Sequence, residues 1–152
     1  MIFSSLKTVT KRLSLVVTVL LFTFFTVSCQ NPAQGNYGEI IGTWTSSYGE
    51  IYTITGSNLK KSGLDYYTQV MTEFFSGDNL QVRFEDGDSG YIYFTYTKAY
   101  NSDDVDKWGA VHYKNLTSNS VSLSDAYKEY GESSTVTLED AIIEFTVENG
   151  YF

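Results

Sequence analysis

The chain has 152 residues, of which 18 are acidic and 10 basic, and its formal net charge is −8 at neutral pH. A negative field repels phosphate backbones and anionic lipid, so the composition argues against nucleic-acid binding. The single cysteine excludes an internal disulfide, and the length suits one domain with one modest core.

The first residues have the pattern of a secretory signal. Three basic residues stand before position 13, and an apolar run of 15 residues follows at positions 13–27. That length fits the core of a signal peptide and falls short of the ~20 residues that a membrane-spanning helix needs. The only cysteine, Cys29, comes just after the run. We therefore predict a removable signal peptide over residues 1–28.

The residues before Cys29 resemble the bacterial lipobox, in which small residues precede a cysteine that becomes acylated. Cleavage would follow Thr26-Val27-Ser28, where Thr26 takes the position at which leucine is usual, a looseness known from spirochaete lipoproteins. Acylation accounts for a cysteine without a partner, because a free thiol is unusual in an oxidising compartment. An uncleaved N-terminal anchor and a secreted protein with a free thiol are the two alternatives.

A lipidated cysteine implies a protein held at a bacterial membrane. Residues 29–38 are polar with scattered glycines, and we predict that they form the lipidated tether. Removal of residues 1–28 takes away three bases and no acid, which changes the net charge from −8 to −11. We expect a place in the cell envelope, at the outer membrane, with membrane lipid held through acylated Cys29. Whether the domain faces the periplasm or the cell surface is open.

The remaining residues, 39–152, are predicted to form one mainly β domain. Segments rich in aromatic and β-branched residues alternate with turn signals, one of which is the run Ser-Gly-Asp-Asn at positions 76–79. Strands are expected at residues 40–46, 50–55, 59–62 (as an edge strand), 66–75, 80–85, 91–98, 108–116 and 120–127. Regular spacing of this kind predicts an antiparallel up-and-down meander that closes into a small barrel.

The end of the chain changes from the period of a strand to that of a helix. Thr137 and Asp140 approximate a capping box, and apolar residues then recur at helical spacing. We predict one short C-terminal helix at about residues 137–145. The last two residues, Tyr151 and Phe152, are expected to lie beside the first strand.

Near the start of the domain, Gly42-Thr43-Trp44 resembles the Gly-x-Trp of the first strand in lipocalins and the wider calycin group. The resemblance implies a lipocalin-like barrel with Trp44 packed across one end as a structural core residue. The segments EIYTIT, YIYFTYTK, WGAVHYKNLTSNSVSLS and TLEDAIIEFT are similar to a family of small lipoproteins from treponemal spirochaetes. This second likeness carries no established activity.

Aromatic side chains supply the candidate contacts with a ligand or partner. In the strand at 91–98, Ile92, Phe94 and Tyr96 are expected to face the core, which leaves the alternate residues on the other face. Tyrosine and tryptophan combine an apolar ring with a polar group, so they suit either a core or a partner. The candidates for contact with a partner or apolar ligand are Tyr91, Tyr93, Trp108 and Tyr113. The alternative is that these rings fill the core.

Candidates for catalysis or metal binding are few. His112 is the only histidine and has no nucleophile motif around it, so we expect a hydrogen-bonded strand histidine. Asp86-x-Asp88 and Asp104-x-Asp106 offer oxygen ligands but lack the length and terminal Glu of an EF-hand, so solvated turn carboxylates are expected. We predict no enzymatic activity, no cofactor and no metal.

These observations predict a membrane-anchored envelope lipoprotein that is monomeric and acts by binding. Its target would be a small apolar ligand inside the barrel or a protein partner on the tyrosine-rich surface. The alternative is a structural envelope protein or an inhibitor-like module with no ligand. An empty barrel interior would favour a small ligand inside it, and a filled interior would remove that version of the binding function.

Overall fold

The computed structural model describes residues 37–152, which belong to one compact unit. The predicted signal peptide (residues 1–28), Cys29 and most of the predicted tether lie outside the described residues. Among residues 37–152, no helix has the length and apolar character needed to cross a membrane.

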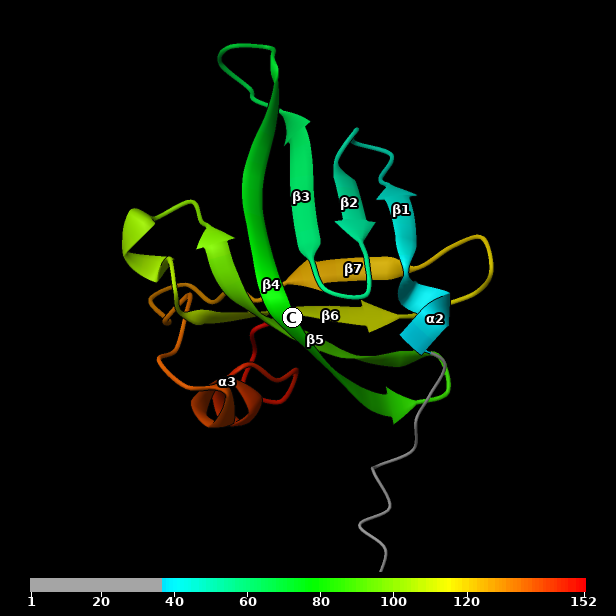
Figure 1. Cartoon of the computed structure of the whole chain (residues 1–152), viewed down its shortest axis with the longest axis vertical. Helices are drawn as coiled ribbons and strands as arrows, with labels where there is room; N and C mark the ends of the chain where they lie inside the picture. The colour runs from blue at the N-terminus through cyan, green and yellow to red at the C-terminus, as the bar shows by residue number, and fades with distance from the viewer. Residues whose placement is uncertain (1–36) are drawn as a thin grey trace, which may run out of the picture. The chain divides into compact units, whose positions relative to one another are not determined.

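Seven strands form one antiparallel sheet in which each strand pairs with the next along the chain (Figure 1). The predicted mainly β, up-and-down meander is thereby confirmed. The strands are β1 (Gly42–Thr45), β2 (Ile51–Ile54), β3 (Leu59–Leu64), β4 (Met71–Asp86), β5 (Ser89–Lys98), β6 (Trp108–Lys114) and β7 (Ser122–Asp125). The helices are α2 (Tyr37–Ile40), the 3-10 turn η1 (Ser102–Asp104) and α3 (Leu138–Glu144).

The long strand β4 curls the sheet into a half-barrel. Its first part, residues 71–77, pairs with β3, and its second part, residues 76–86, pairs with β5. The sheet therefore turns over along β4, and β1 to β3 lie across β5 to β7 in Figure 1. Within residues 37–152 no backbone ladder joins β1 to β7, so the barrel is open along one side.

The predicted turn at 76–79 was wrong, because β4 runs through it and joins the strands predicted at 66–75 and 80–85. The first of these is confirmed only for residues 71–75, since residues 66–70 belong to the β3–β4 turn. Residues 79 and 80 together face the single residue Phe94 of β5, which is a β-bulge. Asn79 has a positive φ of 54° within it. Gly, Asp and Asn are favoured in turns because they tolerate such backbone angles, and the same tolerance lets them bend a continuous strand.

Gly77 permits the bend because it has no side chain. A Cβ there would lie 2.2 Å from Cδ2 of Phe94 and 2.7 Å from the carbonyl oxygen of Thr95. We expect Gly77→Ala to lower the free energy of unfolding by about 1–3 kcal/mol, because the backbone or the ring must move. The control is Gly87→Ala in the β4–β5 turn, where a Cβ meets nothing within 4 Å. Urea denaturation of both variants checks this, and equal stabilities would contradict it.

Two hydrophobic cores lie on the two faces of β5 and β6. The alternation of residues 91–98 predicts the first, but the expectation of a single core was wrong, because α3 and the chain end cover the other face. The inner core fills the curl of the sheet and the outer core lies under α3. Buried residues of the inner core include Ile54, Leu59, Phe75, Ile92, Phe94, Val111 and Tyr113. Buried residues of the outer core are Tyr91, Tyr93, Ala110, Ala141, Phe145 and Tyr151.

The inner core is filled by side chains. The rings of Phe75 and Phe94 stack with centroids 5.6 Å apart, and Tyr96 meets Phe94 edge-on at 4.8 Å. Trp44 packs against the same core, and its indole N–H donates to the carbonyl oxygen of Ile40 at 3.0 Å. A ligand site therefore has to be sought outside the inner core.

The two ends of the domain differ in part from prediction. Residue 40, expected in the first strand, closes α2 instead, where its carbonyl oxygen accepts from the Trp44 indole and its side chain is buried in the inner core. The predicted C-terminal helix is confirmed: the hydroxyl of Thr137 accepts from the N–H of Asp140 at 3.1 Å. The chain end does not lie beside β1. The carbonyl oxygen of Tyr151 accepts from the N–H of Tyr127, just after β7, at 3.0 Å.

Candidate functional site

A buried lysine occupies the centre of the sheet. The prediction of β3 as an edge strand was wrong, since β3 lies between β2 and β4. Lys60 points to solvent, while Lys61 is only 7% exposed. A buried lysine requires compensating partners, because loss of hydration strongly disfavours its charge.

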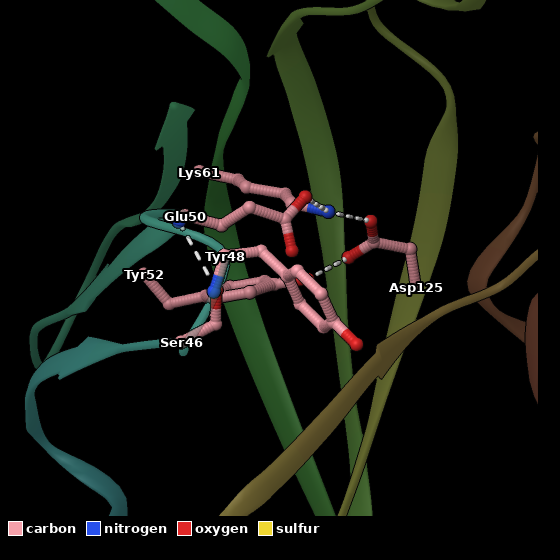
Figure 2. A network of polar contacts seen from close by, with 6 residues as sticks. All are labelled: Ser46, Tyr48, Glu50, Tyr52, Lys61 and Asp125. Carbon is pink, nitrogen blue, oxygen red and sulfur yellow. Dashed lines mark hydrogen bonds and ion pairs between the residues drawn. The ribbon is translucent and has the colours of Figure 1, made fainter. Parts of the chain in front are cut away.

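The partners of Lys61 come from two other parts of the sheet (Figure 2). The Lys61 ammonium lies 2.9 Å from a carboxylate oxygen of Glu50, in the turn before β2. It also donates to Oδ2 of Asp125 on β7 at 2.8 Å. The hydroxyl of Tyr52 donates to the other oxygen of Asp125 at 2.7 Å. These four residues, the Lys61 network, tie β2 and β3 to β7 across the open side of the half-barrel.

The pKa of two members of the network, Lys61 and Tyr52, is raised. Burial acts to lower the pKa of Lys61, but the hydrogen bonds and charges of Asp125 and Glu50 outweigh it and raise that pKa. Burial, followed by the charge and hydrogen bond of Asp125, raises the pKa of Tyr52 far above its ordinary value. Lys61 is therefore a charged structural group and not a free base for catalysis at neutral pH.

A cleft opens directly beside this network. It has a volume of about 430 Å³, and we call it the mouth cleft. Its lining residues are Phe75, Tyr96, Ala99, Tyr100, Asn101, Asp104, Asp125, Ala126, Tyr127 and Ser133. The volume falls in the range usual for small-ligand sites. Asp125 belongs to both features, so the Lys61 network fixes one wall of the cleft.

Aromatic rings form the other walls of the mouth cleft. Phe75 stands opposite Lys61 in the register of β3 and β4, which places the cleft next to the network. Tyr100 is 70% exposed and stacks on Phe74 with ring centroids 5.7 Å apart. It therefore lies at the rim of the cleft, where the stacking contact orients its ring. Tyr127 is exposed in a similar way.

The mouth cleft carries negative charge. Asp104 is buried and accepts a hydrogen bond from the Ser134 hydroxyl at 2.6 Å. Burial, followed by the charges of Asp125 and Asp104, raises the pKa of Tyr96, which shows that both carboxylates act on this ring. In the part of the chain that the structure describes, no basic side chain lines the cleft.

A second cleft of about 620 Å³ lies between β1 and the loop before β7. Its lining is mostly short hydroxyl and amide side chains, with one carboxylate (Glu39) and two aliphatic side chains, and Trp44 is its single aromatic side chain. Across residues 37–152, no three or more His, Cys, Asp or Glu side chains come together as they would to hold a metal ion. The mouth cleft is thus the site with the more distinctive chemistry.

The four aromatic residues predicted to contact a partner lie on both faces of the sheet. Tyr91 and Tyr93 are at most 2% exposed in the outer core, and Trp108 packs partly buried against it. Tyr113 is 1% exposed in the inner core. The structure does not bring the four together at the surface, and their burial agrees with the alternative that these rings fill the cores.

The hydroxyl of Tyr113 is buried and has no hydrogen-bond partner among the described residues. Burial, followed by the charges of Glu85 and Asp88, raises its pKa to about 12. We expect Tyr113→Phe to raise the free energy of unfolding by about 1 kcal/mol, since it removes an unpaired polar group. The variant Tyr52→Phe should instead lower the free energy of unfolding by about 1–2 kcal/mol, because the Tyr52 hydroxyl donates a hydrogen bond to Asp125. Thermal denaturation distinguishes these opposite signs, and a shared sign contradicts the assignment.

His112 lies on β6 and is 8% exposed. Its Nε2 atom lies 3.3 Å from a carboxylate oxygen of Glu85. The rings of Tyr91 and Phe152 lie 4.9 and 5.4 Å from the imidazole. The histidine is thus a member of the outer face, packed under the chain end.

The sequence did not indicate the Lys61 network or the mouth cleft. Lys61 and Asp125 are 64 residues apart, and Tyr52 and Asp125 are 73 residues apart. The one available signal was Lys61 itself, which occupies an inward position next to apolar Leu59 on an alternating strand. That alternation was masked by the neighbouring Lys60, because two adjacent lysines are typical of an edge strand.

Comparison of the chain with protein-family models, with curated proteins and with solved structures gives no significant match. The resemblance to lipocalins and to treponemal lipoproteins stays a prediction from the residues quoted for it. The chemistry of the site is therefore argued from its geometry alone.

Proposed function

We propose that the protein is a membrane-anchored envelope lipoprotein whose domain binds a small organic ligand in the mouth cleft. The anchor is the acyl group on Cys29, after removal of residues 1–28. The observation that carries the binding function is the cleft itself, about 430 Å³ of space between aromatic rings and the carboxylates of Asp104 and Asp125. A filled inner core leaves this cleft as the place for a small ligand.

The chemistry of the cleft favours a ligand with an apolar body and a positive charge. Tyr96 and Tyr100 line the cleft with aromatic rings, to which an organic cation is attracted by the ring quadrupole. Asp104 adds negative charge in a partly dehydrated setting, where charge interactions are stronger than in water. The charge of Asp125 is largely balanced by Lys61, which lies 2.8 Å from it. An anionic ligand would meet two carboxylates with no basic side chain in the lining.

The matched probes are choline and its neutral isostere 3,3-dimethyl-1-butanol, titrated into residues 30–152 by calorimetry. Both cores lie wholly inside this segment. We expect choline to bind at least about tenfold more tightly than the isostere, since the two differ only in charge. Tyr100→Ala and Asp104→Asn should each weaken choline binding severalfold. Tyr130→Ala, at a fully exposed tyrosine outside the cleft, is the control and should leave binding unchanged.

The outcomes separate the parts of the proposal. Equal affinity for choline and its isostere removes the preference for a cation and leaves a binding cleft. Binding that survives in both cleft variants places the ligand elsewhere. If neither probe binds, the structural or inhibitor-like alternative is favoured.

The anchor is tested separately from the cleft. Cells that express the full chain are grown with labelled palmitate, and the protein is expected to carry the label. The Cys29→Ala variant should lose both the label and its sedimentation with membranes. A Cys29→Ala protein that is still labelled contradicts lipidation at this residue, and an unlabelled protein that stays in membranes favours the uncleaved anchor.

A further inference from the structure

The hairpin between β3 and β4 ends in an apolar tip, formed by residues 64–71. In Figure 1 this tip projects beyond the turn between β1 and β2. Five of its eight residues are exposed large apolar or aromatic side chains, namely Leu64 (53% exposed), Tyr66 (83%), Tyr67 (90%), Val70 (59%) and Met71 (50%). Each aromatic ring contributes roughly 150–250 Å², so the two rings alone reach the size of the largest apolar patch on a typical monomer, which is often functional.

The tip is held in one conformation by Asp65. One carboxylate oxygen of Asp65 accepts from the N–H of Tyr67 at 3.1 Å and of Thr68 at 2.7 Å. The Thr68 hydroxyl donates to the same oxygen at 2.9 Å. Gln69, with a φ of 56°, donates its N–H to the carbonyl oxygen of Asp65 at 2.9 Å. The exposed rings are therefore presented by an ordered turn, which reduces the entropy lost on binding.

The tip can move from water into an apolar phase with few of its polar groups left unpaired. The N–H groups of Tyr67, Thr68 and Gln69 all donate inside the turn. The Gln69 side-chain amide donates to the carbonyl oxygen of Tyr66 at 2.8 Å, and the N–H of Asp65 donates to the carbonyl oxygen of Val70 at 3.0 Å. Because an unpaired backbone group is costly in an apolar phase, this internal pairing suits a medium that offers no partners.

The charge of the tip argues against a surface with anionic headgroups. In residues 62–72 Asp65 is the one ionisable side chain apart from the two tyrosines, and its carboxylate is occupied by the turn. No basic residue is present there to attract anionic headgroups, and the net charge of −11 after removal of residues 1–28 repels them. Tyrosine with aliphatic neighbours is typical of side chains at the boundary between headgroups and acyl chains.

We propose that the tip of the β3–β4 hairpin inserts into the headgroup layer of a zwitterionic lipid bilayer. Leu64, Val70 and Met71 reach the acyl boundary, and Tyr66 and Tyr67 lie among the headgroups. The proposal does not depend on lipidation or on a ligand in the mouth cleft.

The test is flotation of unlipidated residues 30–152 with phosphatidylcholine vesicles. We expect part of the protein to float, and less of it when phosphatidylglycerol is mixed in. The double variant Tyr66→Ser/Tyr67→Ser should lower the partition coefficient about tenfold or more, because it removes two exposed rings. The melting temperature should not change, since both side chains are exposed.

The control is Tyr130→Ser/Val136→Ser, which removes two exposed apolar side chains from the loop before α3. This variant should float like the unchanged domain. A domain that stays in solution with phosphatidylcholine vesicles overturns the proposal. So does an equal loss in both double variants, which indicates non-specific adsorption, or stronger flotation with phosphatidylglycerol, which indicates attraction by charge.

Discussion

Replacing Lys61 with methionine is expected to lower the free energy of unfolding by about 3 kcal/mol, because it leaves the Asp125 and Glu50 carboxylates without their cation. Methionine keeps most of the apolar stem, so little of the loss comes from packing. Because Asp125 and Glu50 are partly exposed, we expect the loss of unfolding free energy to lie near the lower end of the range for breaking a buried ion pair. Urea denaturation of both proteins measures the difference.

Lys60→Met is the matched control, since Lys60 is the exposed neighbour on the same strand. It should change the free energy of unfolding by less than about 0.5 kcal/mol. A double-mutant cycle with Lys61→Met and Asp125→Asn should give a coupling energy of about 1–3 kcal/mol. Equal stabilities of the two methionine variants, or additive single changes in the cycle, would show that the network does not join β3 to β7.

A second large effect is expected from alkaline pH, where stability should fall steeply above about pH 10. Burial is the largest cause that raises the pKa of seven tyrosines, five of them strongly. It raises the pKa to about 12 for Tyr93, Tyr113 and Tyr151, and further for Tyr52 and Tyr96. In the unfolded chain these groups ionise near pH 10. Above that pH the folded state binds more protons than the unfolded state, so stability decreases as pH rises.

The size of this effect is comparable to the whole stability of a small domain. Each strongly shifted tyrosine removes about 1.4 kcal/mol per pH unit between its unfolded and folded pKa, so the five together remove roughly 7 kcal/mol by about pH 11. Domains of this size have about 5–15 kcal/mol in total. Lys61 acts in the same direction, because its raised pKa contributes stability that is lost as pH rises through the folded value.

Far-ultraviolet circular dichroism and tyrosinate absorbance, recorded together from pH 8 to pH 12, measure the transition. We expect cooperative unfolding between about pH 10.5 and 11.5, and the buried tyrosines should ionise only with it. If all tyrosines titrate together near pH 10 while the fold persists, the two cores are not packed as described.

The parts of the fold that local patterns determine were predictable. The alternation in residues 91–98 correctly placed Ile92 and Phe94 in a core, and Thr137 with Asp140 correctly marked the start of α3. The same residues that favour turns also form β-bulges, so positions 76–79 did not distinguish a hairpin from a bent strand. Only the packing of Gly77 against Phe94 decides between the two.

The candidate site was not predictable, because it forms only when the sheet curls. Asp125 ends a short strand and carries no local signal, and it becomes a partner of Lys61 once β7 crosses β3. The mouth cleft depends on the same curl, since its walls come from β4, β5 and the segments that flank η1 and β7. The sequence also did not distinguish exposed tyrosines such as Tyr100 from the buried ones.

The central claim, that the mouth cleft is a binding site for an organic cation, is tested most directly by amide chemical-shift mapping of residues 30–152 during a choline titration. The account predicts saturable shifts that cluster on the lining of the cleft, at Tyr96, Tyr100, Asp104, Asp125 and Tyr127. The isostere 3,3-dimethyl-1-butanol should cause smaller shifts at the same concentration. Shifts confined to β1 and residues 118–121, around the second cleft, or no saturable shifts at all, would contradict the claim.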